Sequence, residues 1–299
     1  MPYPHPNGSR YSTGKMKKRI LIAGCGRLGQ RLGKALTKEG HTVFGLRRSA
    51  TALPAAIERI QADLLEPGSL CTAIPEQLDQ VFYILTPSEY TDAGYAVAYV
   101  QGLANLLDEL RSRAARRPRV IFVSSTSVYG QSAGEWVDEN SPTHPERFSG
   151  RRLLQAEQLA NDYDGEFISV RFSGIYGPGR ERLIETVKAG ASCQAAPPLY
   201  TNRIHETDCI GVLRHVGGLS QPAGCYLASD HRPSTQCEVM QWLAKALNAK
   251  LPTPVSGTHS GRRCNVSRLQ ESGYHWVYPD FRSGYAPLIN VDSAPDEPH

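Results

Sequence analysis

The chain has 299 residues, of which 40% are hydrophobic, enough to build one large domain or two unequal ones. Its formal net charge of +4 is mild, so the composition indicates neither a nucleic-acid-binding protein nor one that binds a membrane surface. Residues 1–18 are polar and lack the apolar core of a signal peptide, which predicts a disordered extension. No stretch is apolar for long enough to span a bilayer, and we expect a cytoplasmic protein.

Cysteine and histidine spacing argues against cross-links and metals. The seven cysteines contain no C-x-x-C pair, and the nine histidines show no H-E-x-x-H or similar spacing. This pattern is typical of buried residues or free thiols in a reducing compartment. We therefore expect neither a disulfide framework nor a bound metal.

A glycine-rich turn follows the first apolar run, 19–23, and precedes a segment with helical spacing and a second apolar run, 42–46. This order is typical of the unit in which a dinucleotide pyrophosphate binds at a helix N-terminus. The glycines allow a tight turn, a close approach of backbone N–H groups to phosphate, and close packing of helix on strand. A plain glycine turn in a parallel sheet is the alternative. The expected cofactor contacts are Gly24, Cys25, Gly26, Arg27, Leu28 and Gly29.

Two arginines, Arg47 and Arg48, end the second apolar run, where an acidic residue would bind the ribose 2′-hydroxyl of NAD. A guanidinium instead matches the oxygens of a 2′-phosphate. We therefore expect NADP in preference to NAD. The alternative is a pair of solvated surface arginines.

Apolar runs then alternate with helical patterns, which predicts an α/β fold with a doubly wound parallel sheet. The expected strands are 19–23, 42–46, 58–62, 80–85, 119–124 and 166–171, with helices over 93–113 and 148–162. In the helix over 93–113, Tyr95 and Tyr99 begin a stripe that indicates a core-facing side.

The regular alternation ends near residue 173, where segments rich in Pro and Gly separate the helices. This change predicts a dinucleotide-binding domain over 19–172 and a smaller substrate lobe over 173–285, interleaved with the sheet. The polar tail, 286–299, is expected to be disordered.

Most charged residues are expected to be solvated. Glu157 and Asp138 are interpreted as exposed helix and loop charges. A basic cluster follows the helix over 93–113, and it indicates a helix C-terminus and a solvated turn more than a nucleic-acid interface. The cluster consists of Arg111, Arg113, Arg116, Arg117 and Arg119.

Several segments resemble the extended short-chain dehydrogenase/reductase family, its NAD-dependent epimerase/dehydratase group, between about residues 19 and 285. The stretch FVSSTSVYG over 122–130 resembles the fifth-strand signature, and RFSGIYGPGR over 171–180 resembles the sixth-strand motif. The resemblance implies a Rossmann-type domain with a small C-terminal substrate lobe. Ala23 stands where extended members usually carry the first glycine of GxxGxxG, which marks an atypical member.

The resemblance adds expected cofactor and catalytic residues. Asp63 resembles the acidic position after the third strand, which contacts the adenine end of the cofactor. Leu85, Thr86 and Pro87 lie where the fourth strand runs beside the cofactor. Alignment of Val-Tyr-Gly places Ser125 at the active-site serine of the family.

The family's catalytic tyrosine and lysine, four residues apart, have no match. Hydride transfer to a carbonyl carbon needs a proton for the oxygen, and the tyrosine supplies it. The motif's glycine places Ser149 and Leu153 at the two positions, and a shift by one gives Phe148 and Arg152. Neither alignment supplies a phenol or a lysine.

A different proton donor is therefore needed. We expect Ser125 to polarise a substrate oxygen, with Tyr129 or Tyr176 carrying the proton and Tyr90 or His144 as further candidates. Each has a plain structural interpretation as a packed ring or a loop histidine.

The favoured function is an NAD(P)-dependent oxidoreductase, or an epimerase/dehydratase-like protein, acting on a small carbonyl or sugar-nucleotide substrate. The alternative is a catalytically silent NAD(P)-binding sensor or regulatory protein. We expect no nucleic-acid or membrane partner. The resemblance allows a homodimer, because two long helices often pair between subunits in the family.

Overall fold

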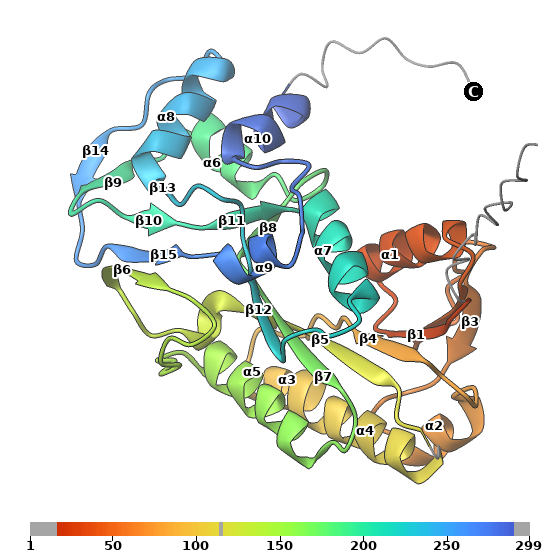
Figure 1. The fold of residues 1–299 in the computed structure, drawn as a ribbon. Coiled ribbons are helices and arrows are strands. Elements are labelled where there is room, and N and C mark those ends of the chain that lie inside the picture. Colours follow the sequence, from red (N-terminus) through yellow and green to blue (C-terminus); the bar gives the residue numbers. More distant parts are fainter. Residues whose placement is uncertain (1–16, 114–115, 290–299) are drawn as a thin grey trace, which may run out of the picture.

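The computed structural model describes residues 17–113 and 116–289. Within them, a seven-stranded sheet has the order β12-β7-β5-β4-β1-β2-β3, with every neighbouring pair parallel (Figure 1). Its strands are β1 (Arg19–Ala23), β2 (Thr42–Arg47), β3 (Glu58–Gln61), β4 (Gln80–Tyr83), β5 (Arg119–Ser125), β7 (Phe167–Phe172) and β12 (Cys225–Ala228). The parallel sheet predicted from the sequence is confirmed.

Helices cover both faces of this sheet, so the fold is doubly wound. Side chains of β1 alternate between the faces: Leu21 packs with one set of helices, while Ile20 and Ile22 pack with the other. Helices α2 (Pro67–Ala73), α4 (Gly102–Arg113) and α5 (Phe148–Gln158) share a core with Leu21, and α1 (Arg27–Lys38), α7 (Glu206–Gly218) and α9 (Ser267–Glu271) share the other.

The helix predicted over 93–113 is a run of three segments: α3 (Asp92–Tyr95), a π-helix (Ala96–Gln101) and α4. Its stripe is buried from Tyr99 onward, as predicted. Tyr95 differs, because it is only half-buried at the start of the run. The helix predicted over 148–162 consists of α5 and a 3-10 turn (Leu159–Asp162).

The second lobe combines short strands with three helices that share a third core. Strand β6, which precedes residue 173, pairs with β15 of the lobe, and β12 of the later chain joins the main sheet. The two parts are therefore interleaved (Figure 1). The remaining elements are a 3-10 turn (Thr126–Val128), β6 (Ala133–Val137), β8 (Gly174–Tyr176), α6 (Arg182–Lys188), β9 (Cys193–Ala196), β10 (Tyr200–Thr201), β11 (Arg203–His205), β13 (Ser234–Thr235), α8 (Gln236–Ala246), β14 (Pro254–Ser256), β15 (Gly261–Cys264) and α10 (Phe281–Ile289).

The expectation that the cysteines form no disulfide is wrong at one pair. Cys193 on β9 and Cys237 on α8 are bonded, with their Cα atoms 5.1 Å apart. The pair is separated by 44 residues in sequence, and only the packing of β9 against α8 brings it together. The free cysteines among the described residues are Cys25, Cys71, Cys209, Cys225 and Cys264.

The predicted terminal segments fall partly outside the described residues. Residues 1–16 and 290–299 are not described, so the disorder expected there is untested. Lys18 is ordered at the base of the sheet, where its backbone N–H donates to His41 Nδ1 over 3.1 Å. Helix α10 ends at Ile289, beyond the boundary expected at residue 285.

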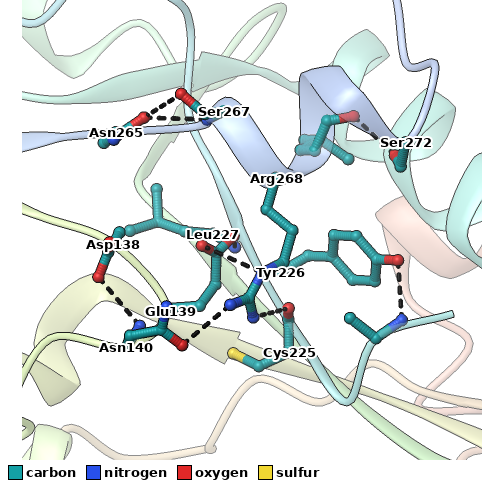
Figure 2. A network of polar contacts seen from close by, with 12 residues as sticks. Asp138, Glu139, Asn140, Cys225, Tyr226, Leu227, Asn265, Ser267, Arg268 and Ser272 are labelled. Carbon is teal, nitrogen blue, oxygen red and sulfur yellow. Dashed lines mark hydrogen bonds and ion pairs between the residues drawn. The ribbon is translucent and has the colours of Figure 1, made fainter.

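The edge of the sheet at β12 is covered by side chains from two other segments (Figure 2). The buried Glu139 carboxylate accepts a hydrogen bond from the Leu227 N–H at 2.8 Å. Arg268 donates to the Cys225 carbonyl oxygen at 3.1 Å and to Asn140 Oδ1 at 2.9 Å. Occupied in this way, the edge offers few free groups to another strand.

Four of the five arginines of the basic cluster form ion pairs in the described structure. Each pair uses a separate acidic residue, so the cluster presents no unneutralised stripe of charge. The pairs are Arg111–Asp108, Arg113–Glu109, Arg117–Asp164 and Arg119–Glu166. In the described ranges no helix is long and apolar enough to cross a bilayer, and no group of three His, Cys, Asp or Glu side chains could hold a metal ion.

Candidate functional site

The glycine turn lies at the carboxyl end of β1 and is shaped by two close contacts. Gly24 has φ +82°, and a Cβ there would lie 2.3 Å from the Ile84 carbonyl oxygen. A residue with a side chain is therefore disfavoured here for two reasons: the backbone is left-handed, and a Cβ would clash with the Ile84 carbonyl oxygen. A Cβ at Gly29 would lie 3.0 Å from Ile22 Cγ2, so this glycine lets α1 pack closely on β1.

The N-terminus of α1 is open to an anion. Gly26 is its N-cap residue and supplies no side-chain cap, and no acidic residue stands in the first turn. A Cβ at Gly26 would have a single neighbour within 4 Å, the Gly24 carbonyl oxygen at 4.0 Å, so the space in front of the turn is free. Unsatisfied N–H groups and the helix dipole make such an end a binding site for phosphate.

Two cavities of about 650 and 370 Å³ meet at this turn. They share Gly24, Gly26, Ile84, Leu85 and Thr86, so the end of β4 and the turn form a common wall. Cys25 lines the larger cavity, and Arg27, Leu28 and Gly29 line the smaller one. Pro87 lines neither of these two cavities.

The larger cavity has a basic end. Arg47, Arg48 and Ser49 line it at the end of β2, and Asp63 lines it beyond β3. In the part of the chain that is described, neither arginine forms an ion pair. Asp63 Oδ1 accepts a hydrogen bond from the Leu65 N–H at 3.0 Å, which fixes one of its two oxygens.

The smaller cavity contains one serine whose proton is free. Ser125 Oγ accepts a hydrogen bond from the Ser127 N–H at 3.1 Å, and its own O–H remains available to a ligand. The other two serines of the cavity already donate: Ser124 to Glu157 Oε1 at 2.6 Å and Ser173 to Ser229 Oγ at 3.0 Å. Ser125 is thus the serine best placed to bind an oxygen atom.

Tyr95 lines the same cavity, although its helical spacing indicated a core residue. Its ring packs edge-on against Tyr90 and Phe148, with centroids 5.5 and 5.4 Å away, and these contacts hold it at the mouth of the cavity. Burial and the neighbouring Tyr90 raise the pKa of Tyr95. The ring is only half-buried, so solvent can reach it.

The tyrosines expected to carry the proton lie elsewhere. The Tyr129 hydroxyl donates to the Asp138 carbonyl oxygen at 2.7 Å and accepts from Arg171 at 2.9 Å. Tyr176 belongs to the core of the second lobe, where its ring stacks on Tyr285 at 4.3 Å. Burial raises the pKa of both phenols. Neither of them lines the cavity that contains Ser125.

The two further candidates are also outside that cavity. Tyr90 is 68% exposed and covers the outer side of Tyr95. His144 lines a separate surface hollow, and its carbonyl oxygen lies 2.2 Å from a Cβ built on Gly130.

Glu157 corrects another expectation, since it is not an exposed charge. Its side chain is 8% exposed and pairs with the buried guanidinium of Arg171, with Oε2 and Nη2 2.6 Å apart. The same carboxylate accepts the hydrogen bond from Ser124. Arg171 in turn donates to Tyr129, so one buried network joins α5, β5 and β7 beneath the smaller cavity.

Comparison with known proteins decides the family. Residues 20–202 match the NAD dependent epimerase/dehydratase family. The chain belongs to this family. Because the family is NAD-dependent, the open N-terminus of α1 and the two cavities can be tested as a dinucleotide site. The uncapped helix end and the space in front of Gly26 both fit such a group.

Two relatives extend the comparison over most of the chain. Protein YeeZ of Escherichia coli K12 is 29% identical over 277 residues, covering 88% of this chain and 97% of its own length. The 3-diazoavenalumate denitrifying reductase of a Streptomyces species is 25% identical over 256 residues, covering 78% and 83%.

Solved structures agree with the family assignment. An NAD-dependent epimerase/dehydratase from Methylobacillus flagellatus is 35% identical with a TM-score of 0.79, covering 93% of this chain and all of its own. WbmG of Bordetella bronchiseptica in complex with NAD and UDP is 18% identical with a TM-score of 0.76, covering 93% and 96%. At this identity the second likeness concerns the fold.

The family's catalytic tyrosine and lysine would align with the start of α5 in this chain. Ser149 is buried there, and Leu153 lines the smaller cavity with an apolar side chain. In the alternative alignment, the Phe148 ring packs against Tyr95 and Tyr90. Arg152 forms a surface ion pair with Asp92 at 2.7 Å.

Proposed function

We propose that the protein is an NAD(P)-dependent oxidoreductase of small carbonyl compounds, without the family's tyrosine–lysine pair. The observation that carries this proposal is the shared cavity of Ser125 and Tyr95 beside the open N-terminus of α1. Ser125 has an available proton there. Of the two tyrosines that line the cavity, Tyr99 already donates its proton to the Leu85 carbonyl oxygen at 3.2 Å, which leaves Tyr95. A dinucleotide-binding sensor would need the turn but not these two hydroxyls.

The proposed roles of Ser125 and Tyr95 follow from their hydroxyl groups, which donate no hydrogen bond within the described structure. When bound, the reduced dinucleotide supplies a hydride to the carbonyl carbon. Ser125 donates a hydrogen bond to the carbonyl oxygen and so polarises the C=O bond. Tyr95 gives that oxygen its proton, which yields the alcohol, and regains one from solvent.

We propose a small substrate rather than a sugar nucleotide. The 370 Å³ cavity has to accept one end of the dinucleotide as well as the substrate. Structures of MoeE5 contain UDP-glucose and NAD, but MoeE5 is only 22% identical and its TM-score is 0.72. The reductase among the relatives supports reduction as the direction of the reaction.

The coenzyme preference is proposed to be NADP, with Arg47 as the contact to the 2′-phosphate. Arg47→Ala is expected to weaken NADPH by about 1.5–3 kcal/mol, the value of a hydrogen bond to a charged group, and to change NADH little. Fluorescence titration with each coenzyme measures this difference. Arg116→Ala removes an exposed arginine away from the cavity and serves as the control. Equal weakening of both coenzymes would exclude Arg47 as the 2′-phosphate contact.

The oxidoreductase proposal is tested by NADPH oxidation with a panel of aldehydes and ketones. Tyr95→Phe should lower kcat by about 10²–10⁴-fold, the usual contribution of a general acid. Ser125→Ala should lower it by about 10²–10³-fold, the usual cost of losing a hydrogen-bond donor to the reacting oxygen. NADPH affinity should not change, because neither hydroxyl is needed to hold the coenzyme. Tyr90→Phe, at the exposed neighbouring ring, should retain the parent rate.

Two results would count against this proposal. A parent protein that binds NADPH but oxidises it no faster than a heat-inactivated control across the panel would favour the sensor alternative. Turnover that survives both Ser125→Ala and Tyr95→Phe would place the proton donor elsewhere.

A further inference from the structure

An arginine that the sequence analysis did not single out lines the smaller cavity. Arg180 follows the Gly177–Gly179 turn, and its backbone N–H donates to the Gly177 carbonyl oxygen at 2.8 Å. Gly177 and Gly179 have φ +147° and +68°, so the chain reverses tightly just before Arg180. This turn places Arg180, which is exposed to solvent, in the lining of the same cavity as Ser125 and Tyr95.

The charge of Arg180 is not neutralised by the protein. The other guanidinium of the cavity, on Arg27, pairs with Glu206 at 2.8 Å, and Arg31 pairs with the same carboxylate. No aspartate or glutamate lines this cavity. Over residues 17–113 and 116–289, no carboxylate lies within ion-pair distance of Arg180. The cavity therefore has one guanidinium available to an anion.

The rest of the cavity wall suits an apolar body. Tyr95, Val123, Leu153, Phe172 and Ile175 contribute aromatic and aliphatic surface. A substrate that matches both features has a flat apolar part and one negative group. An arginine binds such a group well because its planar N–H donors match the two oxygens of a carboxylate.

We propose that the substrate is a small carbonyl compound bearing a carboxylate, and that Arg180 binds this carboxylate. The inference rests on the proposed oxidoreductase function and names its substrate class. Arg180 holds the acidic end, while Ser125 and Tyr95 meet the carbonyl oxygen. An aromatic oxo-acid has this combination of groups.

Binding is tested first, on the protein saturated with NADP⁺. Calorimetry compares benzoate with benzamide and with phenyl phosphate. Benzoate should bind, benzamide should not, and Arg180→Gln should weaken benzoate by about 10- to 100-fold, as expected for a charge-assisted hydrogen bond. Arg182→Gln, at an exposed arginine outside the cavity, should leave benzoate binding unchanged. Selective binding of phenyl phosphate, or no binding of any anion, would overturn the assignment.

Turnover is tested second, with 4-formylbenzoate and its methyl ester. The acid should show the higher kcat/KM, and Arg180→Gln should remove most of this advantage while the Kd for NADPH stays constant. A loss of NADPH affinity in Arg180→Gln would show that the guanidinium binds the coenzyme pyrophosphate, which overturns the proposal. Benzoate binding without turnover of any carbonyl compound would support the anion site and reject the oxidoreductase function, so the two failures are distinguishable.

Discussion

Replacing Gly26 by valine is expected to abolish NADPH binding while leaving the free energy of unfolding nearly unchanged. Outside its chain neighbours and its own helix, a Cβ at Gly26 meets no protein atom closer than 4.0 Å, and its φ of −80° lies outside the left-handed region that favours glycine. The valine methyl groups would instead occupy the space in front of the α1 N-terminus, where a pyrophosphate would bind. Fluorescence titration with NADPH and urea unfolding measure the two effects separately.

Two other glycines make this experiment specific. Gly68 on α2 also has open space at its Cβ but lines neither cavity, so Gly68→Val should still bind NADPH. Gly24→Val should destabilise the fold itself, because of the φ of +82° and the Ile84 oxygen at 2.3 Å. If Gly26→Val bound NADPH as tightly as the parent, the open end of α1 would not be the phosphate site.

The sheet and its first turn were predictable because their signals are local in sequence. An apolar run, a glycine turn and a stripe at helical spacing all lie within residues 19–47, and β1 and β2 have the predicted bounds to within one residue, with α1 between them. A strand that is buried on both faces has a continuously apolar sequence. A helix has apolar residues only at regular intervals, so the two can be distinguished in the sequence.

Residues at the mouth of the site were harder to predict. Tyr95 and Tyr99 belong to one stripe, and both line the smaller cavity, although Tyr99 is also buried in the core; the later members of the stripe are core residues. Helical spacing indicates which side of a helix faces the protein, not whether core or cavity lies there. Arg180 could not be predicted in the same way. Its neighbours Arg27 and Arg31 are neutralised by Glu206 while Arg180, among the described residues, is not, and this difference is visible only in the three-dimensional structure.

Long-range pairs explain the remaining differences. Glu157 and Arg171 are 14 residues apart and lie on α5 and β7, so nothing in either segment alone shows that both charges are buried together. The same holds for Cys193 and Cys237, which meet only when β9 packs on α8. The sequence predicts such residues as exposed or free because that is the usual state of each residue type alone.

Glu157→Ala is expected to lower the free energy of unfolding by about 3–5 kcal/mol, the usual result of removing one partner of a buried ion pair. The Arg171 guanidinium would lose its carboxylate, which lies 2.6 Å away, and would keep only the Tyr129 hydroxyl as a side-chain partner in the described structure. Ser124 would also lose its acceptor, at 2.6 Å. Urea unfolding followed by circular dichroism measures the change.

The control for this prediction is Glu185→Ala, which removes a glutamate from an exposed pair with Lys188 and should change stability little. Replacing both members of the buried pair, with Glu157→Leu and Arg171→Met, should recover part of the loss, because no unpaired charge then remains in the core. If Glu157→Ala and Glu185→Ala had the same small effect, water would have to reach Arg171 in the folded protein. In that case the network beneath Ser125 would contribute little to the stability of the fold.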